Sequence, residues 1–168
     1  MNLGRPQAEG TLDGSGLRVA VVAARFNAQV TDALCRGAVE ALRAKGVAEA
    51  DLQTVWVPGS FELAPTARRL AASGQVDAVV CLGAVIEGGT DHYTYVCQSV
   101  TAALTRLAQD AVEWGRHGVA ISFGVLTCRL LEQAMARAGG SEGNKGADAA
   151  LAALEVARLW EQLGALER

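Results

Sequence analysis

The stretch "DAVVCLGAVIEGGTDHYTYV" (Asp77 to Val96) decides the fold of this chain. Its apolar run Ala78–Ile86 is unbroken, which is typical of a strand that is covered on both faces of a parallel sheet. Two glycines end the run, and Thr90, Asp91 and His92 follow directly before a segment with helical spacing. The order of strand, glycine turn and helix predicts one unit of an α/β fold.

The same alternation is repeated along the chain. Short apolar runs predict strands, and segments whose apolar residues recur at helical spacing predict helices. The expected strands cover residues 17–23, 52–57, 78–86 and 119–126, and the expected helices cover residues 31–46, 61–74, 90–114, 130–139 and 148–166. Strands and helices that alternate in this way imply right-handed crossovers. We therefore expect a three-layer α/β/α sandwich around a four-stranded, mainly parallel sheet.

The composition limits the classes of protein to which the chain can belong. The chain has 168 residues, of which 51% are hydrophobic and 20% are charged, so it can bury a core. No linker divides it, and we expect one α/β domain over residues 17–168, preceded by an arm of residues 1–16. The formal net charge of -3 gives no electrostatic reason to expect nucleic acid as a partner.

The location of the protein is predicted from its amino terminus and its thiols. The arm contains no apolar run, which argues against a signal peptide, and no apolar segment approaches the length of a membrane span. The cysteines form no C-x-x-C pair, which favours buried thiols in a reducing compartment. They are Cys35, Cys81, Cys97 and Cys128. We expect a soluble cytoplasmic protein with no membrane partner.

Ligands of open parallel sheets bind at the carboxyl ends of the strands, so the residues after each strand form the candidate site. After the first strand, Phe26 and Asn27 could stack on a planar ligand and hydrogen-bond its edge. Alternatively, Phe26 packs between helix and sheet while Asn27 caps the next helix. After the second strand, Ser60 leads into a turn that holds Glu62. This carboxylate is either an acceptor for ligand hydroxyl groups or an acid favoured by the helix dipole.

The third strand is followed by the most informative turn. Gly88 and Gly89 allow free backbone N–H groups to approach a ligand, and a helix N-terminus favours an anion. Thr90 can cap the helix or donate to a phosphate oxygen, and His92 lies within a turn of that anion, where it could move a proton near neutral pH. The alternative is a Gly-Gly turn with Thr90 as the cap and His92 half-buried.

After the fourth strand, Phe123 is expected near the strand end and Thr127 as a helix cap. Arg137 and Lys145 bracket a glycine-rich loop, and the alternative reading is that these cations only complement the end of a short helix. That loop lacks the Gly-Lys-Ser/Thr of a P-loop, and the first turn lacks both G-x-G-x-x-G and paired acids. Nucleoside triphosphate, dinucleotide and phospho-receiver functions are therefore not expected. His117 is expected in a surface turn at the opposite edge of the sheet.

Six segments, in this order, resemble the lumazine synthase family: "ARFN", "VPGSFELA", "LGAVIEGGTDHYTYV", "SFGVLT", "EQAMARAG" and "GNKGADAALAALE". The resemblance runs from residue 17 to the last helix and implies a flavodoxin-like sheet. It also implies a transferase of riboflavin biosynthesis, acting at the penultimate step. That enzyme condenses 5-amino-6-(D-ribitylamino)uracil with 3,4-dihydroxy-2-butanone 4-phosphate to 6,7-dimethyl-8-ribityllumazine, releasing phosphate and water. No metal or organic cofactor is implied.

The resemblance carries roles onto individual residues. It implies that Phe26 stacks on the heterocycle, that Glu62 accepts hydrogen bonds from the ribityl chain, and that His92 shuttles protons during the reaction. The residues implied to hold the pyrimidine and ribityl groups are Phe26, Asn27, Ser60, Phe61, Glu62, Ala84, Val85, Ile86, Phe123 and Lys145. The residues implied to bind the phosphate are Gly89, Thr90 and Arg137.

The family's assembly is implied as well. Its sites lie between subunits of a pentamer, so Phe123, Arg137 and Lys145 would come from the adjoining chain. The short loop Gly139–Glu142 and the segment "EGTLDGSG", expected as an added edge strand on a neighbouring subunit, favour a closed shell of twelve pentamers over a lone pentamer. Riboflavin synthase is a further candidate partner. The alternative function is a non-catalytic flavin-binding or cage-forming relative of the same fold.

Three residues depart from the family pattern. Arg129 and Leu130 stand where the family usually has an acidic residue and then Asn or Thr, and Glu87 stands where many members have Arg. A cation in the first turn of a helix opposes the helix dipole by about 0.3–1 kcal/mol, so Arg129 is expected to weaken the following helix slightly. None of the three carries an assigned role in the site.

Overall fold

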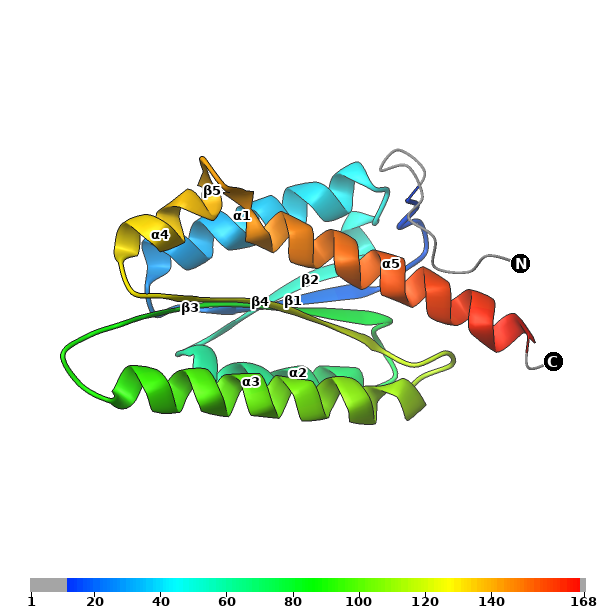
Figure 1. The fold of residues 1–168 in the computed structure, drawn as a ribbon. Helices are drawn as coiled ribbons and strands as arrows, with labels where there is room; N and C mark the ends of the chain where they lie inside the picture. The colour runs from blue at the N-terminus through cyan, green and yellow to red at the C-terminus, as the bar shows by residue number, and fades with distance from the viewer. Residues whose placement is uncertain (1–11, 167–168) are drawn as a thin grey trace.

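Four parallel strands form the centre of the molecule (Figure 1). They are β1 (Val19–Ala24), β2 (Leu52–Val57), β3 (Ala78–Ile86) and β4 (Ala120–Cys128). The structure, a computed structural model, describes residues 12–166, with side chains up to residue 164. The strand order is β2-β1-β3-β4, and each neighbouring pair is parallel. The predicted parallel sheet is confirmed.

Helices cover both faces of the sheet, which completes the predicted three-layer sandwich. The helices are α1 (Ala28–Ala44), α2 (Leu63–Ala71), α3 (His92–Asp110), α4 (Leu131–Ala136) and α5 (Lys145–Leu166), with short 3-10 turns at Glu49–Asp51, Ser60–Glu62 and Ala111–Glu113. In Figure 1, α1, α4 and α5 lie on one face, and α2 and α3 on the other. None of the described helices is both long and apolar enough to cross a membrane.

The two faces of the sheet bury separate apolar cores. Side chains of β1 alternate between them, with Val19 and Val21 under α1 and α5, and Ala20 and Val22 under α2 and α3. Every residue of β1 is therefore buried, as expected of a central strand with helices on both sides. Leu154 brings α5 into the first core, and Leu104, Leu107 and Val100 bring α3 into the second.

The end of β4 differs from the sequence-based expectation. Thr127 was expected to cap the next helix, but it belongs to β4, which stays in register with β3 as far as the pair Ile86–Cys128. The α4 N-cap is instead Leu130, and the side-chain oxygen of Gln133 accepts hydrogen bonds from the N–H groups of Leu130 and Arg129. The strand is longer because β3 offers it two more ladder partners.

The glycine-rich loop before α5 is also more ordered than expected. It forms a small antiparallel hairpin of β5 (Ala138–Gly140) and β6 (Gly143–Asn144). Gly139 and Gly143 adopt positive φ angles of 104° and 75°, which only glycine adopts without strain. Helix α5 then begins at Lys145, three residues earlier than the sequence pattern indicates.

The amino-terminal segment "EGTLDGSG", which was expected to add an edge strand to a neighbouring subunit, lies partly outside the described residues, which begin at residue 12. The described part, residues 12–16, forms a turn on its own chain. Gly14 N–H donates to the Lys45 carbonyl at 2.6 Å, and Arg158 Nε donates to the Asp13 carbonyl at 2.8 Å. This part of the arm is therefore held against the end of α1 and against α5.

An ion pair joins the amino ends of β1 and β3. The Asp77 carboxylate accepts hydrogen bonds from Arg18 N–H, Nε and Nη2 at 2.9, 3.1 and 2.8 Å. Burial alone would raise the pKa of Asp77, but the hydrogen bonds and charge of Arg18 outweigh burial, so the pKa is lowered. The folded protein therefore favours the ionised carboxylate more than the unfolded chain does.

Replacing this carboxylate tests its contribution. We predict that Asp77→Asn lowers the free energy of unfolding by about 1 kcal/mol at neutral pH, a modest value because both side chains are partly exposed. The difference from wild type should persist above the ordinary Asp pKa of 3.8 and vanish as pH falls through the lower folded-state pKa. Urea unfolding over a pH series measures it, and a difference independent of pH would contradict the prediction.

Candidate active site

The strand order reverses between β1 and β3, and we call the space outside the carboxyl ends of these two strands the crevice. The chain runs from β1 outward to β2 on one side, and from β3 outward to β4 on the other. Ligands of such sheets bind outside the carboxyl ends of the strands at this position. A hydrogen bond crosses the crevice here, because Asn27 Nδ2 donates to the Ala84 carbonyl at 2.9 Å.

Asn27 shapes the exit of β1. It occupies the N-cap position of α1 in a left-handed conformation (φ 61°, ψ 46°), but its side chain makes no capping hydrogen bond. The expected alternative, a side-chain cap, is therefore wrong, since the amide is used on Ala84. Phe26 N–H donates to the Pro58 carbonyl at 3.1 Å, and the Phe26 side chain is 71% exposed. The alternative in which Phe26 packs between helix and sheet is also wrong.

The exit of β2 lies beside that crevice. Ser60 is buried against β3, and a Cβ added at Gly83 would lie 2.5 Å from Ser60 Oγ. Phe61 is 62% exposed, like Phe26. Glu62 is partly buried, and its Oε2 accepts a hydrogen bond from Gly59 N–H at 2.9 Å. One carboxylate oxygen thus fixes the turn, and Oε1 accepts no hydrogen bond from the described residues.

The exit of β3 is an open turn, as the two glycines predict. Ala84 is buried, whereas Val85 and Ile86 are partly buried and pair with β4. In the described part of the chain, the backbone N–H groups of Gly88, Gly89 and Thr90 donate to no backbone carbonyl. A Cβ at either glycine would meet no atom within 4 Å. Backbone N–H groups that lack a backbone partner among the described residues therefore line an accessible turn.

Helix α3 follows this turn directly and begins at His92. The N-cap is Asp91 rather than Thr90, so the expectation that Thr90 caps the helix is wrong. His92 is exposed rather than half-buried, which also removes the alternative proposed for it. The imidazole therefore lies at the helix N-terminus, next to the unbonded backbone donors, where an anion is favoured.

Two of the departures from the family pattern interact with each other. Arg129 Nε lies 3.6 Å from Glu87 Oε2, so the residues that follow β4 and β3 form an exposed ion pair. Arg129 also precedes the N-cap Leu130 and lies outside the first turn of α4. The expectation that Arg129 lies in the first turn of the helix is therefore wrong. The sequence signal that could have predicted this ion pair is that Glu87 and Arg129 carry opposite charges and directly follow neighbouring strands.

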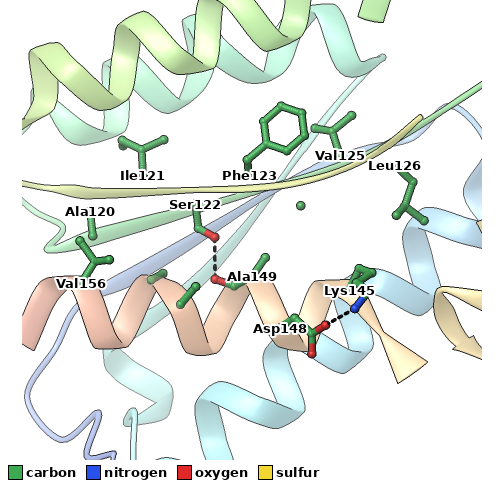
Figure 2. Close-up of a pocket in the computed structure, with 13 residues that line it drawn as sticks. Ala120, Ile121, Ser122, Phe123, Val125, Leu126, Lys145, Asp148, Ala149 and Val156 are labelled. Carbon is green, nitrogen blue, oxygen red and sulfur yellow. Dashed lines mark hydrogen bonds and ion pairs between the residues drawn. The ribbon is translucent and has the colours of Figure 1, made fainter. Parts of the chain in front are cut away.

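Phe123 and Lys145 line a separate pocket along the open edge of β4, with a volume of about 490 Å³. Figure 2 shows Phe123 on the opposite face of β4 from Ser122. Phe123 is 47% exposed and pairs with Cys81 in mid-strand, so the expectation that it lies near the strand end is wrong. Lys145 Nζ pairs with Asp148 at 2.7 Å.

Arg137 is the C-cap of α4 and is partly buried. Its Nη1 donates to the Gln133 carbonyl at 3.1 Å. Burial raises the pKa of the Cys128 thiol at the end of β4, and the charge of Arg137 opposes this effect. The alternative that this cation complements its own helix end is compatible with the Gln133 contact.

The structure thus separates the predicted residues into two groups. Strand exits β1, β2 and β3 bring together one group, namely Phe26, Asn27, Ser60, Phe61, Glu62, Ala84, Val85, Ile86, Gly89, Thr90 and His92. The other group, Phe123, Arg137 and Lys145, is placed by β4 and by the β5–β6 hairpin. Within residues 12–166 no hydrogen bond or ion pair joins side chains of the two groups.

Comparison with known proteins identifies the family. The model of the 6,7-dimethyl-8-ribityllumazine synthase family matches residues 16–161. A 6,7-dimethyl-8-ribityllumazine synthase of Anaeromyxobacter sp. (strain K) is 51% identical over 151 residues, which cover 90% of each chain. The protein of that name from Anaeromyxobacter dehalogenans (strain 2CP-C) is 50% identical over the same share. The chain therefore belongs to the 6,7-dimethyl-8-ribityllumazine synthase family.

Proposed function

We propose that this protein is a transferase that forms 6,7-dimethyl-8-ribityllumazine from 5-amino-6-(D-ribitylamino)uracil and 3,4-dihydroxy-2-butanone 4-phosphate. The observation that carries the proposal is the open Gly88-Gly89 turn, with unbonded backbone donors and His92 at the start of α3. This turn offers an anion site and a proton-transfer group side by side. The family relationship supplies the identity of the substrates.

The crevice at β1 and β3 suits the pyrimidine substrate. Phe26 presents an exposed ring for stacking, and the turn that holds it is fixed by Pro58 and by the Asn27–Ala84 hydrogen bond. Oε1 of Glu62 accepts no hydrogen bond from the described residues and would accept hydrogen bonds from ribityl hydroxyls. The remaining group members, Ser60, Phe61, Ala84, Val85 and Ile86, would line the same crevice.

The phosphate of the second substrate would sit at the start of α3. Gly89 and Thr90 supply backbone donors, and Arg137 supplies a charge-assisted partner. The primary amine adds to the ketone to form an imine with loss of water, phosphate then leaves, and ring closure releases a second water. His92 would carry protons in these steps, so no redox partner is needed.

The divided arrangement of predicted residues supports a homo-oligomeric site. Phe123 lies in β4, and Arg137 and Lys145 flank the β5–β6 hairpin. Among the described residues, no hydrogen bond or ion pair joins their side chains to the crevice residues of the same chain. In a ring of identical chains, one surface meets a different surface of the next chain, so these residues would complete a neighbour's crevice. We propose a pentamer, further assembled into a closed shell of twelve pentamers, in the cytoplasm; riboflavin synthase remains a candidate partner.

A flavin-binding or cage-forming protein without activity is not favoured. Such a protein would need the stacking residue Phe26, but it would have no use for a histidine beside unbonded backbone donors. The presence of His92, Glu62 and Arg137 together is therefore better explained by catalysis.

The first test is direct turnover with a matched pair of variants. Wild-type protein mixed with the two substrates should produce the absorbance of the lumazine. We predict that His92→Ala slows turnover by roughly ten- to several hundred-fold, because one positioned proton carrier is lost while binding and orientation persist. The control is His117→Ala, which changes the histidine in the turn before β4. Equal rates for both variants would remove His92 from the mechanism.

The second test asks whether the site is shared between chains. Assemblies of only His92→Ala chains or only Arg137→Ala chains should be impaired. If the two variants are refolded together, about a quarter of the subunit boundaries should pair an intact His92 with an intact Arg137 and regain activity. Mixed assemblies without such recovery would place both residues in the site of one chain.

The third test is the mass of the assembly in solution. One chain has a mass of 17.4 kDa, and we predict a particle of at least five chains by light scattering. Electron microscopy separates a closed shell from a lone pentamer. A lone pentamer would contradict only the shell, whereas a monomer or dimer would contradict the shared site.

A further inference from the structure

We propose that Asn144 is a positioning residue, which fixes Arg137 and Lys145 by tying the start of α5 to α1. This inference rests on the proposed function, because the purpose of the two cations is to bind substrate. It concerns a residue of the segment "GNKGADAALAALE" to which the sequence-based predictions assign no role.

The Asn144 amide uses both of its ends. Nδ2 donates to the Ala33 carbonyl on α1 at 2.9 Å, across 111 positions of sequence. Oδ1 accepts hydrogen bonds from Gly146 N–H at 2.9 Å and from Ala147 N–H at 3.2 Å. The oxygen therefore satisfies two donors at the start of α5, which would otherwise lack partners, and the nitrogen fastens that helix end to α1.

Two glycines make room for this contact. A Cβ at Gly37 on α1 would overlap the Asn144 amide, and its three nearest atoms all belong to that side chain. A Cβ at Gly146 would overlap the backbone of Leu34 on α1. The two helices therefore approach more closely than side chains at these positions allow, and the Asn144 amide fills the space at Gly37.

The same contact holds both cations. Asn144 pairs with Ala138 in the β5–β6 hairpin, and the next residue, Lys145, donates its N–H to the Arg137 carbonyl at 2.8 Å. Arg137 and Lys145 thus flank a single strand pair, and Asn144 anchors that pair to α1. Both cations have long flexible side chains, so the position of their charge depends on how firmly this backbone is held.

Helix α1 is a suitable anchor because it begins at the crevice. Its N-cap is Asn27, next to Phe26, and Ala33 lies in the second turn of the same helix. One rigid helix therefore supports both the crevice of its own chain and the cations proposed to serve the neighbouring chain. Loss of the Asn144 contact would free the cations without removing their charge.

Two substitutions of Asn144 distinguish its two contacts, namely the hydrogen bonds that Oδ1 accepts at the start of α5 and the hydrogen bond that Nδ2 donates to α1. Asn144→Ala removes both, whereas Asn144→Asp keeps oxygen acceptors for the α5 donors but turns a carboxylate oxygen toward the Ala33 carbonyl. We expect both variants to raise the KM for the butanone phosphate about tenfold. The matched control is Gln162→Glu, an exposed amide-to-acid change on the same helix, which should leave the KM unchanged.

A double-mutant cycle with Arg137→Ala then identifies the route of the effect. If Asn144 acts through Arg137, the Asn144→Asp change should raise this KM by less than about twofold when Arg137 is already absent. Additive effects would overturn the assignment, because they would show that Asn144 acts elsewhere. If wild-type protein shows no turnover, the proposed function fails, and the substrate-binding purpose of Asn144 fails with it.

A second cycle tests the contact without any assay of activity. Gly37→Ala should lower the midpoint of thermal unfolding by roughly 3 °C or more, since the added methyl group displaces the Asn144 amide. In the Asn144→Ala background the same methyl group should have a much smaller effect, because its three nearest atoms belong to the amide that this variant removes. Equal effects of Gly37→Ala in both backgrounds would overturn the tie between α1 and α5.

Discussion

The hydrogen bond from Asn27 to the Ala84 carbonyl follows from a mismatch in strand length, and the candidate site depends on it. The ladder between β1 and β3 ends at the pair Ala23–Leu82, yet β3 continues to Ile86 along β4. Backbone groups of β3 beyond Leu82 therefore lose their partners on the β1 side. The Asn27 side-chain amide replaces one missing partner, because its Nδ2 donates to the Ala84 carbonyl at 2.9 Å. Asn27 itself is left-handed, and the chain turns there with Phe26 exposed beside the crevice.

The fold could be predicted from the sequence because its main signals are local. The apolar run at 78–86 coincides with β3, since a strand covered on both faces needs apolar residues along its length. The expected strand at 52–57 coincides with β2, although this edge strand is largely exposed. Element ends were harder to predict, because partners distant in sequence set them. β4 gains Thr127 and Cys128 by pairing with β3, and the Gln133 side chain rather than a preceding hydroxyl serves the start of α4.

The candidate site could be predicted where its residues follow strands directly. The open turn at Gly88 and Gly89 is of this kind, whereas the residues themselves left the exposure of Phe26 undecided. Contacts between distant segments could not be read from one sequence. Glu87 and Arg129 looked like two unrelated departures until the strand register placed them side by side. Similarly, nothing in the spacing of Gly37 and Asn144 shows that one leaves room for the other.

The two tying contacts divide the task of supporting the site. Asn27 fixes the start of α1 to β3, and Asn144 fixes α5 and its hairpin to the second turn of the same helix. Each uses an amide because the group that needs a donor is a backbone carbonyl, and an amide can still accept or stay neutral where a charged donor would require a counter-ion. In a divided site, a shift of α1 would move the crevice of one chain and the cations offered to the next chain together. In the proposed ring, each chain would pass such an error to its neighbour, which gives a physical reason for close glycine-mediated packing against α1.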